Sequence, residues 1–549
     1  MNKLMMTAVM GLGLAMSASA FDMTFENPKD VCRVVPSTEE LDFPDGFKAT
    51  VRFSVDLDRV DRASRFSNLF CKGDDFLDGY CVMVRYDGYL LIDIKGIEPQ
   101  YYMHNVKLES NREYELQLYV TPKCVRVFID GVEKGSYSFV GDLDYAKNGA
   151  PLHLGSLGHY KFYGNLKSVK LESLKGMTLP PDGPKPPLTK PPKVQARAEV
   201  KWAKPICVEK SRYIGWPTVC CLQNGDLIAV FSGDRDAHVC PWGKVQMVRS
   251  TDGGETWSAP RTIANGALDD RDAGILQMPD GEVIVTYFTS TYWTRPEFLK
   301  NHREWARHLE KISPEARRAA EGDFLIRSRD NGKTWSKPEK LDANYTQSPH
   351  GPIVLKDGAL LQIGRVVTPK KTLIRVSRSD DRGKSWKMLC GDVPDMNGEN
   401  DGTPQLFCEP HAAECADGTL VGLVRYHGSD NCMRLTRSTD GGTTWSPMEK
   451  TPMLGLPPHL IALPDGKLVA VYGRRFACPG YGNFACISDD GGKTWDAANE
   501  IMLMPALSGD LGYPASARLP NGDIVTVYYQ NMGRGLGTCL LATKWRVTR

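Results

Sequence analysis

The sequence lacks an excess of charge of either sign. Its 549 residues include 68 Lys and Arg and 66 Asp and Glu, which gives a formal net charge of +2. Proteins that bind nucleic acid or anionic membranes through their overall charge carry a clear excess of basic residues. We therefore expect no nucleic-acid partner, and any charged ligand must be held by a local cluster of side chains.

Long hydrophobic runs are also missing, except at the N-terminus. No segment after residue 20 approaches the ~20 apolar residues of a membrane helix, so no membrane insertion is expected. Within the first twenty residues, Lys3 precedes an apolar run from Leu4 to Met16 and the small residues Ala18-Ser19-Ala20. This order is typical of a secretory signal peptide. We predict that residues 1–20 are such a peptide and that the protein is exported to the periplasm, the cell surface or the medium.

Cysteine and histidine spacings typical of metal sites are absent too. The fifteen cysteines include no CxxC pair and their number is odd, which does not indicate a regular disulfide framework. We expect most of them to be small buried apolar side chains, with one or two disulfides left open. No His-x-His spacing occurs either, so the sequence predicts no metal ion and no other cofactor.

A proline-rich segment divides the chain. The stretch LPPDGPKPPLTKPPK, residues 179–193, holds seven prolines, which favour extended polyproline geometry. We predict a linker over residues 179–197, between a first domain at 21–178 and a second at 198–549. The first domain alternates apolar and polar residues in short runs, which predicts an all-β jelly-roll sandwich. Its pattern resembles laminin-G or concanavalin-like domains, and whether it binds glycan stays open.

The second domain is built from repeats. Six segments of alternating apolar residues each contain an Asn-Gly or Asp-Gly turn, the strongest short-range hairpin signal. The first five are each followed by one copy of an eight-residue motif: STDGGETW (250–257), SRDNGKTW (328–335), SDDRGKSW (379–386), STDGGTTW (438–445) and SDDGGKTW (488–495). This repetition predicts six four-stranded blades, and hence a six-bladed β-propeller.

The repeated motif itself predicts a structural turn. Its Asp can accept hydrogen bonds from backbone N–H groups two and three residues further on, and its Trp can pack between strands. One insertion interrupts the second blade. Residues 295–321 are rich in helix formers with apolar residues at helical spacing, which predicts helices there.

The motif and the blade pattern resemble the Asp-box propellers of the sialidase (neuraminidase) superfamily, over most of the second domain. The resemblance implies a divergent bacterial exo-sialidase-like enzyme, whose Asp boxes lie on the rim opposite the active site. We therefore searched the other ends of the strands, where polar residues recur at equivalent positions. These residues are Arg235, Asp236, His238, Arg271, Asp272, His350, Arg365, His411, Arg425, His459 and Arg475.

The chemistry of sialic acid suits such residues. This sugar carries a carboxylate on its anomeric carbon, so guanidinium groups can hold it, and a neutral Tyr nucleophile avoids charge repulsion. The resemblance implies that Tyr513 is the nucleophile, Glu409 its partner and Arg425 one arginine of the carboxylate clamp. The family's first clamp arginine is missing, because residues 213–217 read YIGWP there.

Other residues are candidates for the acid/base residue and for the rest of the arginine clamp. Asp236 is a shifted candidate for the acid/base residue. Arg235, Arg271 and Arg475 are candidates to rebuild the clamp. The other predicted substrate-binding residues are Asp272, His238, His350, His411 and His459.

The predicted function is release of terminal sialic acid from glycoconjugates by an exo-α-sialidase, with sialylated or other acidic glycans as partners. Two alternatives stay open. One is a hydrolase or lyase for uronate- or rhamnose-containing glycans, in which His350 or His411 transfers the proton. The other is a propeller that binds glycans without catalysis.

Overall fold

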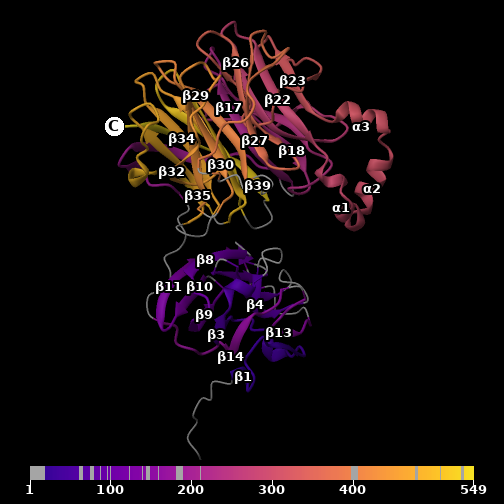
Figure 1. Cartoon of the computed structure of the whole chain (residues 1–549), viewed down its shortest axis with the longest axis vertical. Helices are drawn as coiled ribbons and strands as arrows, with labels where there is room; N and C mark the ends of the chain where they lie inside the picture. Colours follow the sequence, from indigo (N-terminus) through magenta and orange to yellow (C-terminus); the bar gives the residue numbers. More distant parts are fainter. Residues whose placement is uncertain are drawn as a thin grey trace, which may run out of the picture. The chain divides into compact units, whose positions relative to one another are not determined.

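The computed structural model describes residues 19–548, apart from 61–65, 74–78, 87, 96, 99–100, 123, 139, 142, 144–148, 159, 181–189, 210–211, 397, 399–405, 429, 476–479, 507 and 533–536. Most of the predicted signal peptide and the middle of the predicted linker lie outside the described residues. The chain divides into two compact units, Met1–Pro187 and Leu188–Arg549. The fold is all-β with antiparallel sheets (Figure 1).

The first unit contains two six-stranded sheets and a two-stranded pair. The first sheet, in spatial order, is β1 (Ser19–Thr24), β14 (Gly164–Ser173), β3 (Phe47–Val55), β9 (Glu113–Val120), β10 (Cys124–Ile129) and β11 (Val132–Ser138). The second is β2 (Cys32–Val35), β13 (Leu152–Gly155), β4 (Phe66–Lys72), β5 (Tyr80–Arg85), β6 (Tyr89–Ile94) and β8 (Tyr101–Lys107). The pair is β12 (Val140–Gly141) and β7 (Ile97–Glu98).

The two large sheets of this unit face each other through apolar side chains. Alternate residues of β3 are fully buried, as the period of two in a strand requires. The ring of Phe47 on β3 lies 4.6 Å from the ring of Tyr80 on β5, measured between centroids. The apolar residues of the alternating sequence pattern therefore form the buried face between the two sheets.

The second unit contains six sheets in chain order. Five have four strands: β17–β20 (Tyr213–Cys221, Leu227–Arg235, Lys244–Ser250, Arg261–Ala264); β21–β24 (Asp269–Gln277, Val283–Ser290, Asp323–Ser328, Glu339–Lys340); β25–β28 (Ile353–Val354, Leu360–Val367, Thr372–Ser379, Lys387–Cys390); β29–β32 (Phe407–Glu414, Leu420–Tyr426, Cys432–Ser438, Glu449–Leu454); and β33–β36 (Pro458–Ala462, Leu468–Arg474, Gly482–Ser488, Ile501–Pro505). The sixth is β15 (Val194–Gln195), β16 (Ala198–Cys207), β39 (Thr538–Val547), β38 (Ile524–Asn531) and β37 (Leu511–Arg518).

These six sheets contact one another in sequence order, and the last contacts the first. Strand β17 packs against both β21 and β37, while β33 packs against both β29 and β37. The sixth sheet joins the two ends of the unit, because β16 pairs with β39 from Ala198↔Val547 to Cys207↔Leu540. The first strands of the five four-stranded sheets and β37 of the sixth sheet are therefore brought to one central region.

The repeated motif forms the same hydrogen-bonded turn in each copy. In the first copy, Ser250 donates its hydroxyl to Asp252 at 2.7 Å and accepts the N–H of Gly254 at 2.8 Å. Asp252 accepts the backbone N–H of Thr256, four residues further on, at 2.9 Å. The same donor recurs at Asp330, Asp381, Asp440 and Asp490. The predicted donor three residues on also contributes in each copy: its N–H lies 3.1 Å from Asp440 and 3.0 Å from Asp490, and it hydrogen-bonds to Asp252, Asp330 and Asp381 as well. The donor four residues on is an addition to the predicted turn.

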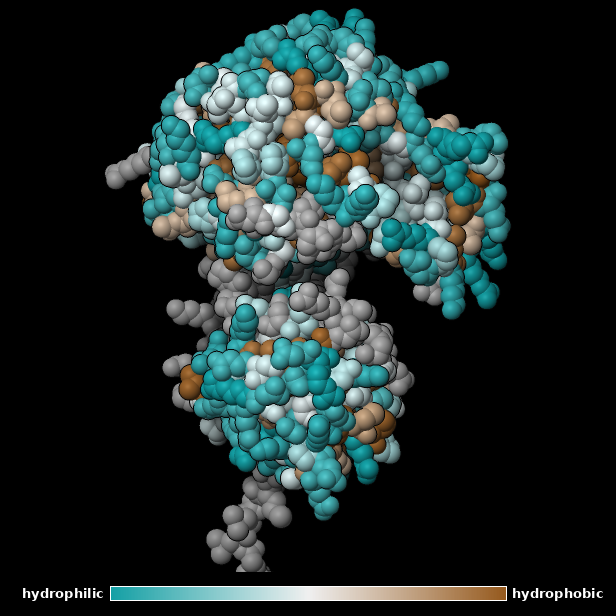
Figure 2. Space-filling view, viewed as in Figure 1, coloured by the Kyte–Doolittle hydropathy of each residue, from teal (hydrophilic) through white to brown (hydrophobic). Residues whose placement is uncertain are grey.

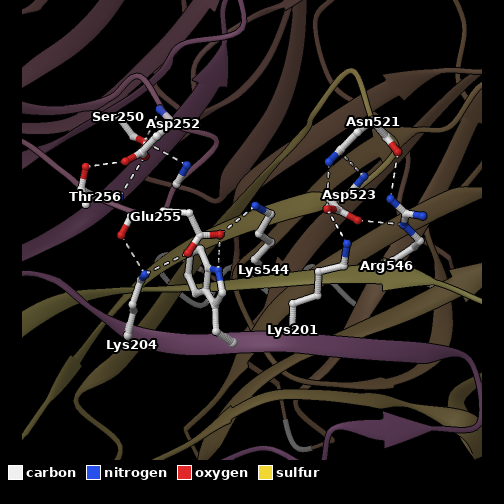
Figure 3. A network of polar contacts seen from close by, with 12 residues as sticks. Lys201, Lys204, Ser250, Asp252, Glu255, Thr256, Asn521, Asp523, Lys544 and Arg546 are labelled. Carbon is white, nitrogen blue, oxygen red and sulfur yellow. Dashed lines mark hydrogen bonds and ion pairs between the residues drawn. The ribbon is translucent and has the colours of Figure 1, made fainter.

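The first of these turns is also tied to the sixth sheet. Figure 3 shows Glu255 between Lys204 of β16 and Lys544 of β39, with an ion pair of 2.9 Å to Lys544. On the same strands, Asp523 accepts from Lys201 and Arg546, each at 2.7 Å. The contacts of Glu255 fasten the sixth sheet to the first, whereas those of Asp523 lie within the sixth sheet.

The predicted insertion is helical. Between β22 and β23 lie η3 (Tyr292–Thr294), α1 (Pro296–Asn301), α2 (Arg303–Glu310) and α3 (Pro314–Ala320). The short 3-10 helices elsewhere are η1 (Glu39–Leu41), η2 (Leu57–Arg59) and η4 (Ala497–Asn499). Figure 1 shows α1–α3 together at one side of the second unit. Trp293 and Trp305 from this segment are buried with Cys240, so the helices pack against the loop after β18.

The visible face in Figure 2 is mainly hydrophilic, with smaller hydrophobic areas. No helix within the described ranges is long and apolar enough to span a membrane. All cysteines that the structure describes are free thiols, most of them buried.

We expect the Asp252→Ala variant to melt a few degrees below the wild type at pH 7, because the turn loses its hydrogen-bond acceptor. Hydrogen bonds from Thr256 lower the pKa of Asp252 to about 2. The stabilisation is complete above the ordinary Asp pKa of about 4 and is lost as the pH falls through 2, so the difference should shrink in acid. Thermal melts between pH 7 and pH 3 measure it.

The matched control is Asp236→Ala, which removes an exposed carboxylate and its surface ion pair. Such pairs contribute little, so this variant should melt close to the wild type. Equal melting of wild type and Asp252→Ala at pH 7 would show that the turn does not stabilise the unit.

Candidate active site

Four of the central strands carry the same local distortion. The register of β17, β21, β29 and β37 shifts at a bulge, and one residue beside each shift has a positive φ. These residues are Trp216 (54°), Asp272 (49°), Glu409 (48°) and Tyr513 (49°). A non-glycine residue in this region costs about 1–3 kcal/mol and is typical of functional sites. Because a bulge redirects its side chain, these four residues outline the candidate site.

The sequence contains a signal for three of these four bulges, which is a proline. Proline in a central strand is tolerated chiefly at bulges, because it cannot donate to the ladder. Trp216, Glu409 and Tyr513 each precede a proline. Trp216 was missed as a site residue because we looked for an arginine at that position of the first blade.

Tyr513 and Glu409 are in direct contact, as the family resemblance implied. The Tyr513 hydroxyl donates to Glu409 Oε1 at 2.6 Å. Arg425 forms an ion pair with Glu409 Oε2 and also lies 3.2 Å from the Tyr513 hydroxyl. All three side chains are buried. The three residues come from β29, β30 and β37, so only the tertiary fold brings them together.

The charges around this group keep the glutamate ionised. Burial by itself raises the pKa of Glu409, but Arg425 and Arg365 lower it to about 2. Burial also raises the pKa of Tyr513 well above its usual value, and the charge of Glu409 adds to this effect. At neutral pH the pair is therefore a phenol that donates to a carboxylate.

Two further arginines lie beside the pair. Arg475 lies 5.4 Å from the centre of the Tyr513 ring and donates to the Tyr529 hydroxyl at 2.5 Å. Arg365, one of the polar residues at the strand ends, donates to Gln347 at 3.1 Å. With Arg425, these residues gather three guanidinium groups around Tyr513 and Glu409.

The two arginines of the first and second sheets have different environments. Arg235 is fully buried and donates both terminal nitrogens to Asp269, so its charge is matched within the protein. Arg271 lies over the Trp216 ring, 4.2 Å from its centre, and its ion pair with Asp269 is long, with 3.9 Å between Nε and Oδ2. Arg271 is therefore better placed than Arg235 to bind a ligand.

The predicted acid/base residue Asp236 lies apart from the Tyr513 group. Its side chain is about half exposed and forms an ion pair of 2.5 Å with Arg212. It lines a cavity of about 470 Å³ together with Lys244, Trp242 and His308. His238, two residues further on, faces the other way: its Nδ1 lies 3.1 Å from the Tyr213 hydroxyl and its ring packs against Trp216.

The three predicted histidines form a buried cluster. The rings of His411 and His459 stack at 4.2 Å, and the ring of His350 lies 4.9 Å from that of His459. Burial lowers the pKa of all three, so they are neutral at physiological pH. Among the described residues, no cluster of His, Cys, Asp or Glu could hold a metal ion. Substrate binding by these histidines stays a prediction.

The second unit thus combines Asp-box turns on an all-β fold with a buried Tyr–Glu pair among arginines. Comparison with known proteins finds the same repeats. Residues 298–526 match the BNR repeat-like domain family, and residues 248–259 match the BNR/Asp-box repeat. A sialidase of Bacteroides fragilis (strain YCH46) is 26% identical over 325 residues, which cover 52% of this chain and 55% of that protein. The chain thus spans about half the length of this curated relative.

Similar folds occur among solved structures. A protein of unknown function from Dyadobacter fermentans is 22% identical, with a TM-score of 0.54, over 64% of this chain and 100% of that chain. The NanB sialidase of Streptococcus pneumoniae is 14% identical, with a TM-score of 0.44, over 96% of this chain and 98% of that chain. The repeats and the curated relative together support a relation to the sialidase superfamily.

We expect the Arg425→Met variant to be less stable than the wild type by about 3–5 kcal/mol, because it leaves the buried carboxylate of Glu409 without its ion-pair partner. The double variant Arg425→Met/Glu409→Gln should regain much of this loss, since the uncompensated charge is then gone. Urea unfolding followed by tryptophan fluorescence measures the free energy of unfolding.

Arg378→Met is the matched control, because Arg378 forms ion pairs only with the exposed carboxylates of Asp357 and Asp380. It should cost less than about 1 kcal/mol. If Arg425→Met proved as stable as this control, the buried pair would not carry the charge balance described above.

Proposed function

We propose that this protein is a sialidase-type glycoside hydrolase that releases terminal sialic acid from glycoconjugates. The observation that carries the proposal is the buried contact of Tyr513 with Glu409, 2.6 Å long, with Arg425 bound to both. A tyrosine activated by a glutamate suits a substrate that carries its own carboxylate at the reacting carbon, because a carboxylate nucleophile would be repelled. The sequence similarity to the Bacteroides fragilis sialidase supports the same class.

In this reaction the Tyr513 oxygen attacks the anomeric carbon while its proton passes to Glu409. The glycosidic C–O bond breaks at the same time, and the departing oxygen takes a proton from water. The ionised state of Glu409 at neutral pH makes it ready to accept that proton. Transfer during bond formation also avoids a free phenolate, which burial makes costly. Water then hydrolyses the sugar–tyrosine bond, and the proton returns from Glu409 to the departing tyrosine.

The substrate carboxylate is held by arginines in this proposal. Arg425, Arg475 and Arg365 surround the pair, and Arg271 has only a long ion pair, of 3.9 Å, with Asp269. Gly215 and Trp216 stand where the family's first clamp arginine is expected. Arg271, which lies over the Trp216 ring, is the candidate to compensate for that loss. Guanidinium forks suit a carboxylate because they can donate two parallel hydrogen bonds.

The finer architecture belongs to the same proposal. We infer that the six sheets of the second unit are the blades of a six-bladed β-propeller, closed by the pairing of β16 with β39. We infer a laminin-G or concanavalin-like jelly roll for the first unit, from its two facing sheets. Export through a signal peptide over residues 1–20 is proposed from the sequence pattern alone.

The two alternative functions make different demands on the site. A lyase or hydrolase for uronate or rhamnose glycans would use a histidine such as His350 or His411, yet both are buried in the central cluster and held neutral. A propeller that only binds glycans has no need for a strained tyrosine paired with a glutamate. The contact of Tyr513 with Glu409 therefore favours catalysis.

We expect the Tyr513→Phe variant to release sialic acid from sialyllactose at least about a hundredfold more slowly than the wild type, because the nucleophile is lost. Tyr528→Phe is the matched control. Tyr528 is another buried tyrosine, whose hydroxyl contacts Thr543 at 2.7 Å instead of the site. This control should keep its activity.

Release of free sialic acid by both variants and the wild type can be followed by chromatography. Equal activity of Tyr513→Phe and the wild type would remove Tyr513 from the mechanism. Activity only on uronate or rhamnose oligosaccharides would favour the second function, and binding without release of sugar would favour the third.

A further inference from the structure

The second unit contains a cavity that the proposed reaction does not use. It encloses about 470 Å³, which lies within the range of about 300–1,000 Å³ that is usual for ligand pockets. Tyr513, Glu409 and Arg425 are not among the described residues that line it. We call it the insertion cavity, and the side chains that matter below are Arg212, Asp234, Asp236, Trp242, Lys244 and His308.

The helical insertion forms one wall of this cavity. Trp293 and Trp305 anchor the insertion, because both side chains are buried together with Cys240 of the loop after β18. This packing places His308 of α2 beside Trp242 of the same loop, with 4.5 Å between the ring centroids. The insertion therefore supplies a wall that a plain four-stranded sheet would lack.

Trp242 offers an aromatic surface to a ligand. Its side chain is only half-buried, although it borders the apolar cluster that contains Trp305. One face of a sugar in the pyranose form carries mainly C–H groups, which can pack on a flat aromatic ring. This contact is favourable because it removes carbon surface from water. An aromatic ring at the edge of a polar cavity is therefore suited to a carbohydrate.

The charged side chains of the cavity neutralise one another. Arg212 forms ion pairs with Asp236 at 2.5 Å and with Asp234 at 3.3 Å. Lys244 forms a further ion pair with Asp234. Burial lowers the pKa of His308, so its ring is neutral at neutral pH. Two cations thus face two carboxylates, and a ligand meets no net charge.

The same ion pairs hold hydrogen-bonding groups in place for a ligand. A carboxylate can accept about four hydrogen bonds and a guanidinium carries about five N–H donors, so both retain unused capacity. The side chains of Arg212 and Asp236 are 43% and 48% exposed, which leaves them accessible. Adjacent hydroxyls of one sugar can therefore donate to the carboxylate and accept from the guanidinium.

Other classes of ligand suit the cavity less well. No cluster of His, Cys, Asp or Glu in the described part of the chain could hold a metal ion. An anion would have to displace Asp234 or Asp236 from its cation, and an apolar molecule would desolvate the charged groups without replacing their hydrogen bonds. Two smaller cavities, of about 350 and 260 Å³, have no aromatic side chain among the described residues that line them.

We propose that the insertion cavity is a second carbohydrate site, which binds one neutral hexopyranose unit of a glycan. The C–H face of the sugar packs on Trp242, while two adjacent hydroxyls bind Asp236 and Arg212. The site holds a glycan to the second unit and takes no part in bond cleavage. This role goes beyond the proposed function and does not depend on Tyr513.

The test measures binding of methyl glycosides to the full chain by ligand-observed NMR titration. The neutral probes are methyl β-galactoside, methyl β-glucoside and methyl α-mannoside, and the charged probe is methyl β-galactosiduronate. We expect at least one neutral glycoside to bind with a Kd of about 1 mM, as the size of the ligand allows. The uronate should bind at least about tenfold more weakly than its neutral counterpart, because its carboxylate meets those of Asp234 and Asp236.

Two variants and two matched controls locate the binding. Trp242→Leu removes the aromatic surface, and Asp236→Asn removes a charged acceptor on an exposed side chain. Each should weaken the binding by about tenfold, which corresponds to the loss of one charge-assisted hydrogen bond or of a comparable packing contact. Trp202→Leu and Asp357→Asn are the controls, because neither residue is among the described residues that line the cavity. Both should bind as the wild type does.

The outcomes separate this site from the proposed function. Tyr513→Phe should bind the neutral glycosides as the wild type does, and a wild type that binds them without cleaving sialyllactose would refute only the proposed function. The inference is overturned if no neutral glycoside binds, if the uronate binds more tightly, or if Trp242→Leu and Asp236→Asn both bind like the wild type. If circular dichroism shows that Trp242→Leu does not fold, Asp236→Asn decides.

Discussion

The pairing of β16 with β39 is the contact on which the second unit depends. It joins the first long strand of the unit to its last, and β38 and β37 follow in the same sheet. Because β37 packs against β17, this pairing also brings Tyr513 beside Trp216. Ala198, Val200 and Trp545 bury the joint, and the ion pairs of Glu255 and Asp523 fasten its outer end. The candidate site is assembled from several sheets, so it depends on the pairing that joins the last sheet to the first.

The candidate site is made by distortions of that regular arrangement. Each sheet has one strand at the centre, and four of these strands, β17, β21, β29 and β37, carry a bulge with a left-handed residue. The cost of about 1–3 kcal/mol for each must be offset by the packing around it. The same backbone conformation, a bulge with a positive φ, therefore occurs at four residues whose side chains differ in chemistry: Trp216, Asp272, Glu409 and Tyr513. The repetition that builds the fold also supplies equivalent positions for different functional groups.

The electrostatics of the site separate its two carboxyl groups. Arg425 binds Glu409 directly, which keeps that carboxyl group ionised. Asp272 lies near arginines but receives only one hydrogen bond, from a neutral amide, so burial has the larger effect on it. The two environments therefore move the pKa values of Glu409 and Asp272 in opposite directions.

The sequence alone determined the features that arise from local chemistry. The Asp-box turns, the hairpins and the helical insertion follow from residues close together in the chain, and the structure contains all three. The pairing of Tyr513 with Glu409 was reached through family resemblance rather than local pattern. The tertiary structure alone decided the partners of the charged residues: Arg235 with Asp269, Asp236 with Arg212, and the histidines with one another. The physical reason is that burial and long-range ion pairs depend on which strands become neighbours. In a repeated sequence the strand ends look alike, so the pattern does not predict which of their charged residues will pair.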